Sequence, residues 1–265
     1  MRHGLFVANV GTYSDPRNVV RLAEVAEGSG WEAFLIWDHL AFVWGPPAAD
    51  PWVTLAAVAS STSRLLVGTG ITPIPRRRPQ VLAQTVATLD LLSGGRVVFG
   101  AGLGGVPSEF TAFGEEDAPR ARAEQLDEGL DLLRRLWSGQ RVEHRGRHYT
   151  VDGVTLAPLP LRQPLPIWIG GNSKRALARA ARFDGWFGDT ADSERMTTTP
   201  EDLATLVASL PTGRSFEVVV HGRSDQVEPG VYAAAGATWW LEDVHDLRGP
   251  FGELLDIVAA GPPRV

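Results

Sequence analysis

The chain has no cysteine, which excludes disulfides, thiolate metal sites and thiol catalysis. Lysine is almost absent too, because Lys174 is the only one and every other Lys/Arg position is arginine. Schiff-base chemistry would therefore depend on Lys174, which we place in a helix rather than inside a barrel. No apolar run reaches the roughly 18 residues of a membrane span, and the first apolar run is too short for a signal peptide. We expect a cytoplasmic protein that does not bind membranes.

Positive charge is not in excess. The chain has 25 Lys and Arg against 31 Asp and Glu, with a formal net charge of −6, so it has no general attraction to nucleic acid. Hydrophobic residues make up 44% of its 265 residues, and a (β/α)₈ barrel needs roughly 250 residues. No break in composition marks a second domain, so we expect a single domain over residues 1–265.

The stretch from Arg64 to Gly114 shows the chain's organisation most clearly. Leu65–Val67 and Val97–Phe99 are short apolar runs bounded by glycines, typical of strands buried on both faces. Between them, apolar residues recur at helical spacing from Val81 to Leu92. Two buried strands joined by a helix form a right-handed parallel unit, and function in such units gathers at the carboxyl ends of the strands.

The same alternation runs along the whole chain and predicts eight strands. We expect the strands at Leu5–Asn9, Ala33–Trp37, Leu65–Val67, Val97–Phe99, Ile167–Ile169, Gly185–Gly188, Phe216–Val220 and Ala237–Leu241. Helices are expected between them, with the long amphipathic one at Arg120–Trp137 and a hairpin at Arg141–Leu156. This α/β pattern favours a (β/α)₈ TIM barrel over an open doubly wound sheet.

Asp38 and His39 follow the second expected strand and form the best catalytic candidate. Histidine titrates near neutrality and can exchange a proton with a substrate oxygen or a cofactor. The alternative is that His39 only forms a hydrogen bond to a neighbouring loop.

Gly170, Gly171, Asn172 and Ser173 lie between the fifth strand and a helix. The free N–H groups of a first helical turn suit a phosphate, although Asn172 or Ser173 could simply cap the helix.

The glycine-rich run from Gly100 to Gly105 lacks the G-x-G-x-x-G frame of a dinucleotide fold at a helix start. We expect these glycines, Gly102 among them, to let the strand end approach a flat ring closely. The basic run Arg76–Arg78 is either a solvated loop or a contact for an anionic cofactor tail.

The remaining polar candidates are weaker. The scattered acids predict helix caps rather than a metal site. His221 and Glu242 fall at strand ends and could face a pocket. Trp239 and Trp240 alternate in the last strand, so one of them should face the barrel interior.

Three segments carry a resemblance to the bacterial luciferase-like oxidoreductases. They are GWEAFLIWDHL, the stretch from DPWVTLAA to VVFGAGLG, and IWIGGNSKRALARAARFDGW. A further motif, GATWWLE, and the terminal GPPR look like a compact branch of that family. The resemblance implies a (β/α)₈ barrel with a reduced flavin, or the related 5-deazaflavin coenzyme F420, at the carboxyl ends of the strands.

The resemblance also implies roles for particular residues. His39 matches a histidine beside the reactive edge of the ring, and Gly70–Ile71 matches a cis, non-proline peptide behind it. Gly171 to Ser173 match the phosphate-binding loop. Glu109 lies in the loop after the fourth strand, where family members place a cofactor-facing residue, and this makes it a second catalytic candidate. Trp44 does not align cleanly as a ring contact.

Three functions follow from these observations. The first is monooxygenation of a small organic substrate with reduced FMN and O2, the FMN being supplied by a separate flavin reductase. The alternative is hydride transfer through F420, whose longer anionic tail would favour Arg76–Arg78. The third is a flavin-binding barrel without catalysis. The resemblance also implies a homodimer.

Overall fold

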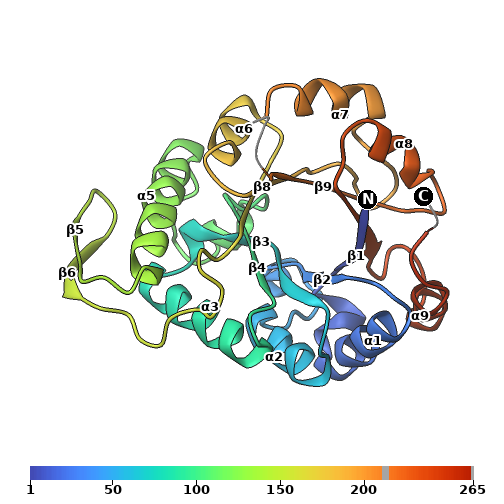
Figure 1. Cartoon of the computed structure of the whole chain (residues 1–265), viewed down its shortest axis with the longest axis horizontal. Coiled ribbons are helices and arrows are strands. Elements are labelled where there is room, and N and C mark those ends of the chain that lie inside the picture. The colour runs from blue at the N-terminus through green and yellow to red at the C-terminus, as the bar shows by residue number, and fades with distance from the viewer. Residues whose placement is uncertain (211–214, 264–265) are drawn as a thin grey trace.

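The computed structural model describes residues 1–210 and 215–263, and eight parallel strands in it close into a barrel surrounded by helices (Figure 1). Around the barrel the order is β1-β10-β9-β8-β7-β4-β3-β2. The strands are β1 Arg2–Val7, β2 Ala33–Ile36, β3 Leu66–Pro73, β4 Val97–Gly102, β7 Ile167–Gly170, β8 Gly185–Phe187, β9 Glu217–Gly222 and β10 Trp239–Val244. The predicted (β/α)₈ barrel is therefore confirmed.

Helices follow the strands on the outside of the barrel. They are α1 Pro16–Gly28, α2 Pro51–Ser61, α3 Pro79–Ser93, α4 Ser108–Thr111, α5 Pro119–Trp137, α6 Lys174–Ala180, α7 Pro200–Val207, α8 Pro229–Ala234 and α9 Phe251–Ala259. Short 3-10 turns lie at η1 Gly11–Ser14, η2 Ala41–Val43 and η3 Ile74–Arg76.

Helix starts are set by proline and side-chain caps. The Asp50 carboxylate accepts hydrogen bonds from the N–H groups of Trp52 and Val53, both at 2.9 Å, and Pro51 opens α2. Asp15 and Thr199 cap α1 and α7 in the same manner, again with proline at the first helical position.

Several strands extend further than their apolar runs indicated, and β3 and β10 show why. β3 was expected to end at Val67 but continues to Pro73, because Thr72 and Pro73 pair with β4 again beyond a bulge after Thr69. The last strand was expected to end at Leu241 but pairs with β1 as far as Val244. The additional residues of both strands include glycines or polar residues, and a search for apolar runs does not find such residues.

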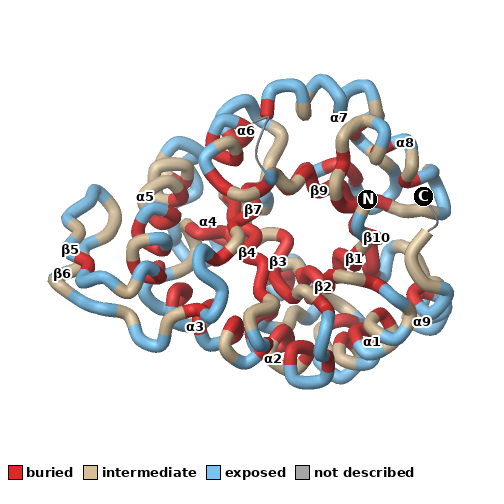
Figure 2. The backbone as a smooth tube through the Cα atoms, in the orientation of Figure 1, coloured by how far each residue is buried: buried red, intermediate tan, exposed pale blue. Residues whose placement is uncertain are grey.

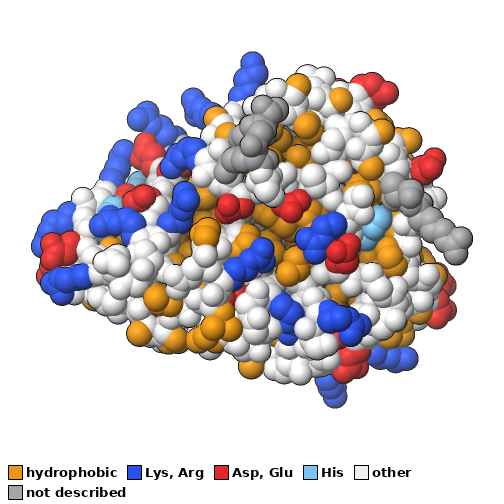
Figure 3. Space-filling view, in the orientation of Figure 1, with side chains coloured by type: hydrophobic (Ala, Val, Ile, Leu, Met, Phe, Trp, Pro, Cys, Tyr) orange, Lys and Arg blue, Asp and Glu red, His pale blue; other side chains and the backbone are white. Residues whose placement is uncertain are grey.

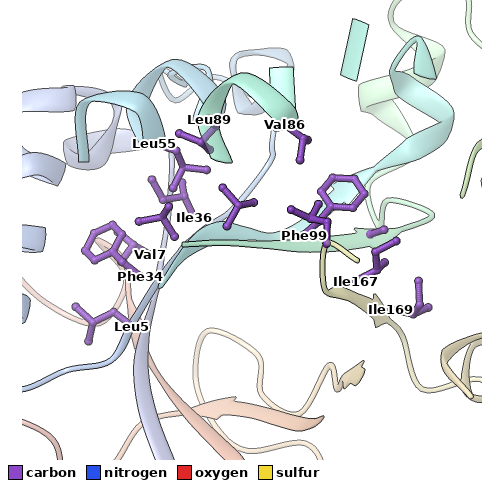
Figure 4. Packing of buried hydrophobic residues seen from close by; sticks show 14 of the residues in the cluster. Leu5, Val7, Phe34, Ile36, Leu55, Val86, Leu89, Phe99, Ile167 and Ile169 are labelled. Carbon is purple, nitrogen blue, oxygen red and sulfur yellow. The ribbon is translucent and has the colours of Figure 1, made fainter. Parts of the chain in front are cut away.

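The core has two layers, one inside the barrel and one between barrel and helices. Figure 4 shows the outer layer, with Val7, Phe34 and Ile36 of the strands among the labelled residues together with Leu55 and Leu89 of the helices. Figure 2 shows burial concentrated on the strands and on the inward sides of the helices.

Successive side chains of β10 point to opposite sides of the barrel wall, so its two tryptophans lie in different layers, as predicted. Trp239 belongs to the inner layer, where its ring lies 5.7 Å from that of Trp168. Trp240 belongs to the outer layer.

The predicted hairpin is also present and projects from the barrel beside α5, as β5 Val142–Arg145 and β6 Thr150–Val154 (Figure 1). Glu128 of α5 holds it, because its carboxylate accepts the N–H groups of His148 and Tyr149 and contacts the His144 ring. On the face in Figure 3, basic and acidic side chains are interspersed over this part of the molecule.

Candidate active site

A cavity of about 490 Å³ opens at the carboxyl ends of the barrel strands. Nine of the ten predicted site residues line it: Asp38, His39, Gly70, Ile71, Glu109, Gly170, Gly171, Asn172 and Ser173. His39 follows β2 and Ser173 follows β7, so the parallel strands bring together residues that are far apart in the sequence. Such a volume lies in the range of small-molecule and cofactor sites.

His39 and Glu109 form a hydrogen-bonded pair in this cavity. His39 Nδ1 lies 3.1 Å from Glu109 Oε1, and the His39 side chain is partly exposed while the Glu109 side chain is buried. The same carboxylate accepts the N–H of Leu40 and pairs with Arg76. Burial opposes ionisation of Glu109, but its hydrogen bond to His39 and the charge of Arg76 outweigh that effect and lower the pKa of this carboxyl. Glu109 thus orients the His39 ring through Nδ1.

Arg76 and Arg77 have a role that neither sequence interpretation included. Arg76 is only 5% exposed, and its guanidinium contacts Asp38 at 2.9 Å as well as Glu109. Arg77 contacts Asp38 at 2.7 Å. These two arginines are therefore neither a solvated loop nor free for a cofactor tail, because buried carboxylates neutralise them. Only Arg78 of the run is exposed.

Asp38 lines the cavity and also has structural partners, and its predicted contact with the cofactor stays a prediction. Its side chain is fully buried, and Thr72 donates a hydrogen bond to it in addition to the two arginine contacts. The carboxylate therefore anchors Arg76 and Arg77 beside His39.

The Gly70–Ile71 peptide is cis, as the resemblance implied. Gly70 must lack a Cβ, since one would lie 2.8 Å from Phe6 and 2.9 Å from Phe187. The Ile71 side chain fills the space next to Gly102, where a Cβ would lie 1.7 Å from Ile71 Cδ1. Gly102 is not among the residues that line the cavity, and its missing side chain makes room for Ile71, so the ring contact predicted for it stays a prediction.

The loop after β7 lines the cavity, and its side chains also have structural partners. Ser173 Oγ caps α6 by accepting the N–H of Ala176 at 3.1 Å. The Asn172 amide pairs with the backbone of Asp189 at 2.6 Å and 3.0 Å. The capping alternative is thus observed, and phosphate binding by this loop stays a prediction.

His221 faces the cavity and Glu242 does not. Glu242 is completely buried, contacts Arg248 at 2.6 Å and accepts hydrogen bonds from Ser224 and Trp240. Side chains alternate along β10, so Glu242 lies on the outward side with Trp240, and Asp243 is the acid that lines the cavity. Sequence reasoning missed Asp243 as a cavity residue because it ended this strand at Leu241, three residues before its end at Val244.

The cavity also has an aromatic wall that the sequence did not reveal. Phe6, Trp37 and Phe187 line it, with ring centroids 5.7 Å apart for Phe6 and Trp37 and 5.2 Å apart for Phe6 and Phe187. Over residues 1–210 and 215–263, no three His, Asp or Glu side chains converge in a way that could hold a metal ion.

Comparison with known proteins gives the family. A model of the luciferase-like monooxygenases matches residues 1–235 of the chain. The chain belongs to this family. Its fold is shared with an F420-dependent secondary alcohol dehydrogenase solved with an F420-acetone adduct (TM-score 0.80, 18% identity, 98% of this chain and 99% of that one). It is shared as well with a monooxygenase of Streptomyces bottropensis (TM-score 0.77, 23% identity, 97% and 96%).

Curated relatives of this luciferase-like chain include F420-dependent enzymes. An F420-dependent hydroxymycolic acid dehydrogenase of Mycobacterium tuberculosis is 36% identical over 183 residues, which is 66% of this chain and 49% of that protein. An F420-dependent glucose-6-phosphate dehydrogenase of Microbacterium testaceum is 34% identical over 174 residues, which is 63% of this chain and 51% of that protein. The chain therefore spans about half the length of these relatives. Among the described helices, none has the length and apolar character to cross a membrane.

Proposed function

We propose that this luciferase-like oxidoreductase transfers hydride between F420 and a small alcohol or its ketone. The observation that carries the proposal is the His39–Glu109 pair in the cavity, supported by the F420-dependent dehydrogenases among the curated relatives. The comparisons thus favour the alternative from the sequence over the preferred FMN-dependent monooxygenation. Monooxygenases share this fold, so the choice has to be tested.

The cavity's shape fits a planar ring. One wall is backbone, where Gly70 excludes even a Cβ, and the Ile71 side chain packs behind it against Gly102 and Gly170. The other surfaces include the rings of Phe6, Trp37 and Phe187. Gly171, Asn172 and Ser173 lie at the rim, where we predict the coenzyme's phosphate. When bound, F420 would accept or supply the hydride, and the protein would supply orientation and proton handling.

His39 is the proton-handling residue in this proposal. With Nδ1 held by Glu109, the Nε2 side of the ring remains for the substrate hydroxyl, whose proton it takes as the alcohol is oxidised. The Glu109 carboxylate stabilises the resulting imidazolium. In the direction of reduction, His39 returns the proton to the ketone oxygen. The aromatic wall gives the cavity an apolar surface beside the reacting groups.

A binding and turnover experiment tests the proposal. The purified chain is titrated with F420 and with FMN, and binding is followed by fluorescence. We expect micromolar affinity for F420, weaker affinity for FMN, and anaerobic reduction of F420 by secondary alcohols. In His39→Asn, coenzyme affinity should stay within about threefold while turnover falls by about 10²-fold or more. Preferential binding of FMN with substrate-dependent oxygen uptake would refute the F420 assignment and restore the monooxygenase.

A further inference from the structure

The loop that follows His39 is apolar and yet exposed. Residues 40–49 read LAFVWGPPAA and include no charged, hydroxyl or amide side chain. Within this loop Phe42 is 53% exposed and Trp44 is 46% exposed. Proteins rarely leave neighbouring large apolar side chains in water unless these bind an apolar ligand or partner.

A second loop brings another exposed aromatic ring to the same place. The connection after β4 carries Glu109 and α4, and α4 contacts η2 of the first loop. Phe113 lies two residues beyond α4, and its ring centroid is 6.0 Å from that of Phe42. Phe113 is also about half exposed. Phe42, Trp44 and Phe113, which together we call the apolar rim, thus come from two loops that both start at the cavity.

The apolar rim is continuous with the reacting position. The ring centroid of Trp44 lies 5.6 Å from that of His39, with the two rings edge to face. The Trp37 ring is also near His39, at 5.7 Å, but Trp37 belongs to the cavity lining while Trp44 lies outside it. His39 therefore contacts one ring inside the cavity and one outside. A substituent that leaves the cavity past His39 meets the rim at Trp44.

We propose that the apolar rim binds a hydrocarbon chain of the substrate, so that the enzyme prefers long-chain alcohols and ketones over short ones. This inference rests on the proposed function, which places the reacting oxygen at His39. A coenzyme ring takes up part of the cavity of about 490 Å³, so a long chain has to extend beyond it. A second copy of the chain seated on the rim would cover the ring next to His39, whereas a substrate chain reaches the rim from His39 itself.

The first test needs no coenzyme and no turnover. The isotope-labelled chain is titrated with octan-2-ol and with butan-2-ol, and the indole N–H resonances of its nine tryptophans are followed by NMR. The Trp44→Phe variant assigns the Trp44 signal. Octan-2-ol should shift this signal with an affinity about 10-fold or more above that of butan-2-ol, since each buried methylene adds about threefold to fourfold. Equal affinities, or no saturable shift, would overturn the proposal whichever coenzyme the protein uses.

Variants show whether the rim causes this preference. The double variant Phe42→Ser/Phe113→Ser removes two exposed rings, so the ratio of the two affinities should fall to about threefold or less. Val154→Ser is the matched control, because Val154 is similarly exposed but lies on the hairpin, and it should leave the ratio unchanged. A ratio that survives in the double variant contradicts the role of the rim.

Light scattering tests the other occupant. We expect the unaltered chain and the double variant to have the same oligomeric state. A dimer that dissociates only in the double variant would show that a second copy covers the rim, and it would overturn the proposal.

The last test measures chain-length preference in the F420-dependent reaction. From butan-2-ol to octan-2-ol, kcat/KM should rise about 10-fold or more while kcat stays within about threefold, because equal binding in the ground and transition states lowers KM alone. In the double variant this rise should largely disappear. Equal kcat/KM values for the two alcohols in the unaltered enzyme contradict the proposal. Absence of any F420 turnover would instead count against the proposed function, while the NMR result would still decide binding by the rim.

Discussion

At the scale of single residues, the site depends on buried carboxylates that hold basic side chains in place through hydrogen bonds and ion pairs. Glu109 holds His39 and Arg76, while Asp38 holds Arg76 and Arg77. Each carboxylate is close to fully buried, and its partners compensate for the cost of removing it from water. The consequence is a preorganised histidine whose orientation depends on a neighbour 70 positions along the chain.

Glu109→Gln tests this dependence. The amide keeps the shape of the side chain but removes the charge that stabilises a protonated His39. We expect kcat to fall by about 10-fold or more, with coenzyme affinity within about threefold, measured by steady-state kinetics and fluorescence titration.

The matched control is Glu124→Gln, which alters a partly exposed carboxylate of α5 outside the cavity. It should leave kcat within about twofold. Equal kcat values in Glu109→Gln and the unaltered enzyme would show that Glu109 does not assist His39.

At the scale of elements, one side chain joins consecutive βα units. Glu27, near the end of α1, accepts hydrogen bonds from the N–H groups of Ser63, Arg64 and Leu65 in the connection from α2 to β3. Burial raises its pKa, but these backbone donors outweigh that effect and lower the pKa of Glu27 to about 2. A short loop is thereby held at the amino-terminal end of the barrel.

We expect Glu27→Gln to destabilise the protein at neutral pH by about 1–3 kcal/mol, since the charged hydrogen bonds are replaced by weaker ones. Because the folded-state pKa is depressed, this stabilisation is present above the unfolded value near 4.5 and is lost as the pH falls toward 2.

Urea unfolding at several pH values measures the effect. The difference between the variant and the unaltered chain should shrink below about pH 4.5. A difference that does not depend on pH would show that the carboxylate charge is not the cause.

At the scale of the whole molecule, the barrel interior is filled and the cavity occupies only its carboxyl end. Trp168 and Trp239 lie within the inner layer, and Arg2 covers the Trp239 ring at 4.0 Å from its centroid. The homodimer implied by the family resemblance stays a prediction.

Trp239→Ala should lower the free energy of unfolding by about 3–5 kcal/mol, because it opens a cavity in the closed barrel. Trp44→Ala is the matched control: that side chain is 46% exposed, and its removal should cost less than about 1 kcal/mol. Similar losses in the two variants, measured by chemical denaturation, would contradict a packed interior.

The barrel, its eight strands and nine of the residues that line the cavity could be predicted from the sequence alone. Buried parallel strands produce apolar runs, helices produce a 3.6-residue period, and both signals are local. The positions of His39, Glu109 and the Gly170–Ser173 loop at strand ends followed from that pattern and from the family resemblance.

Only the tertiary structure decided which partners these residues have. Nothing local distinguishes an arginine in water from one, like Arg76, that is buried between two carboxylates. The pairing of His221 with Asp243 and the Ile71 side chain beside Gly102 are likewise contacts between different strands. Closure of the barrel creates them, because it brings residues that are distant in sequence within a few ångströms of one another.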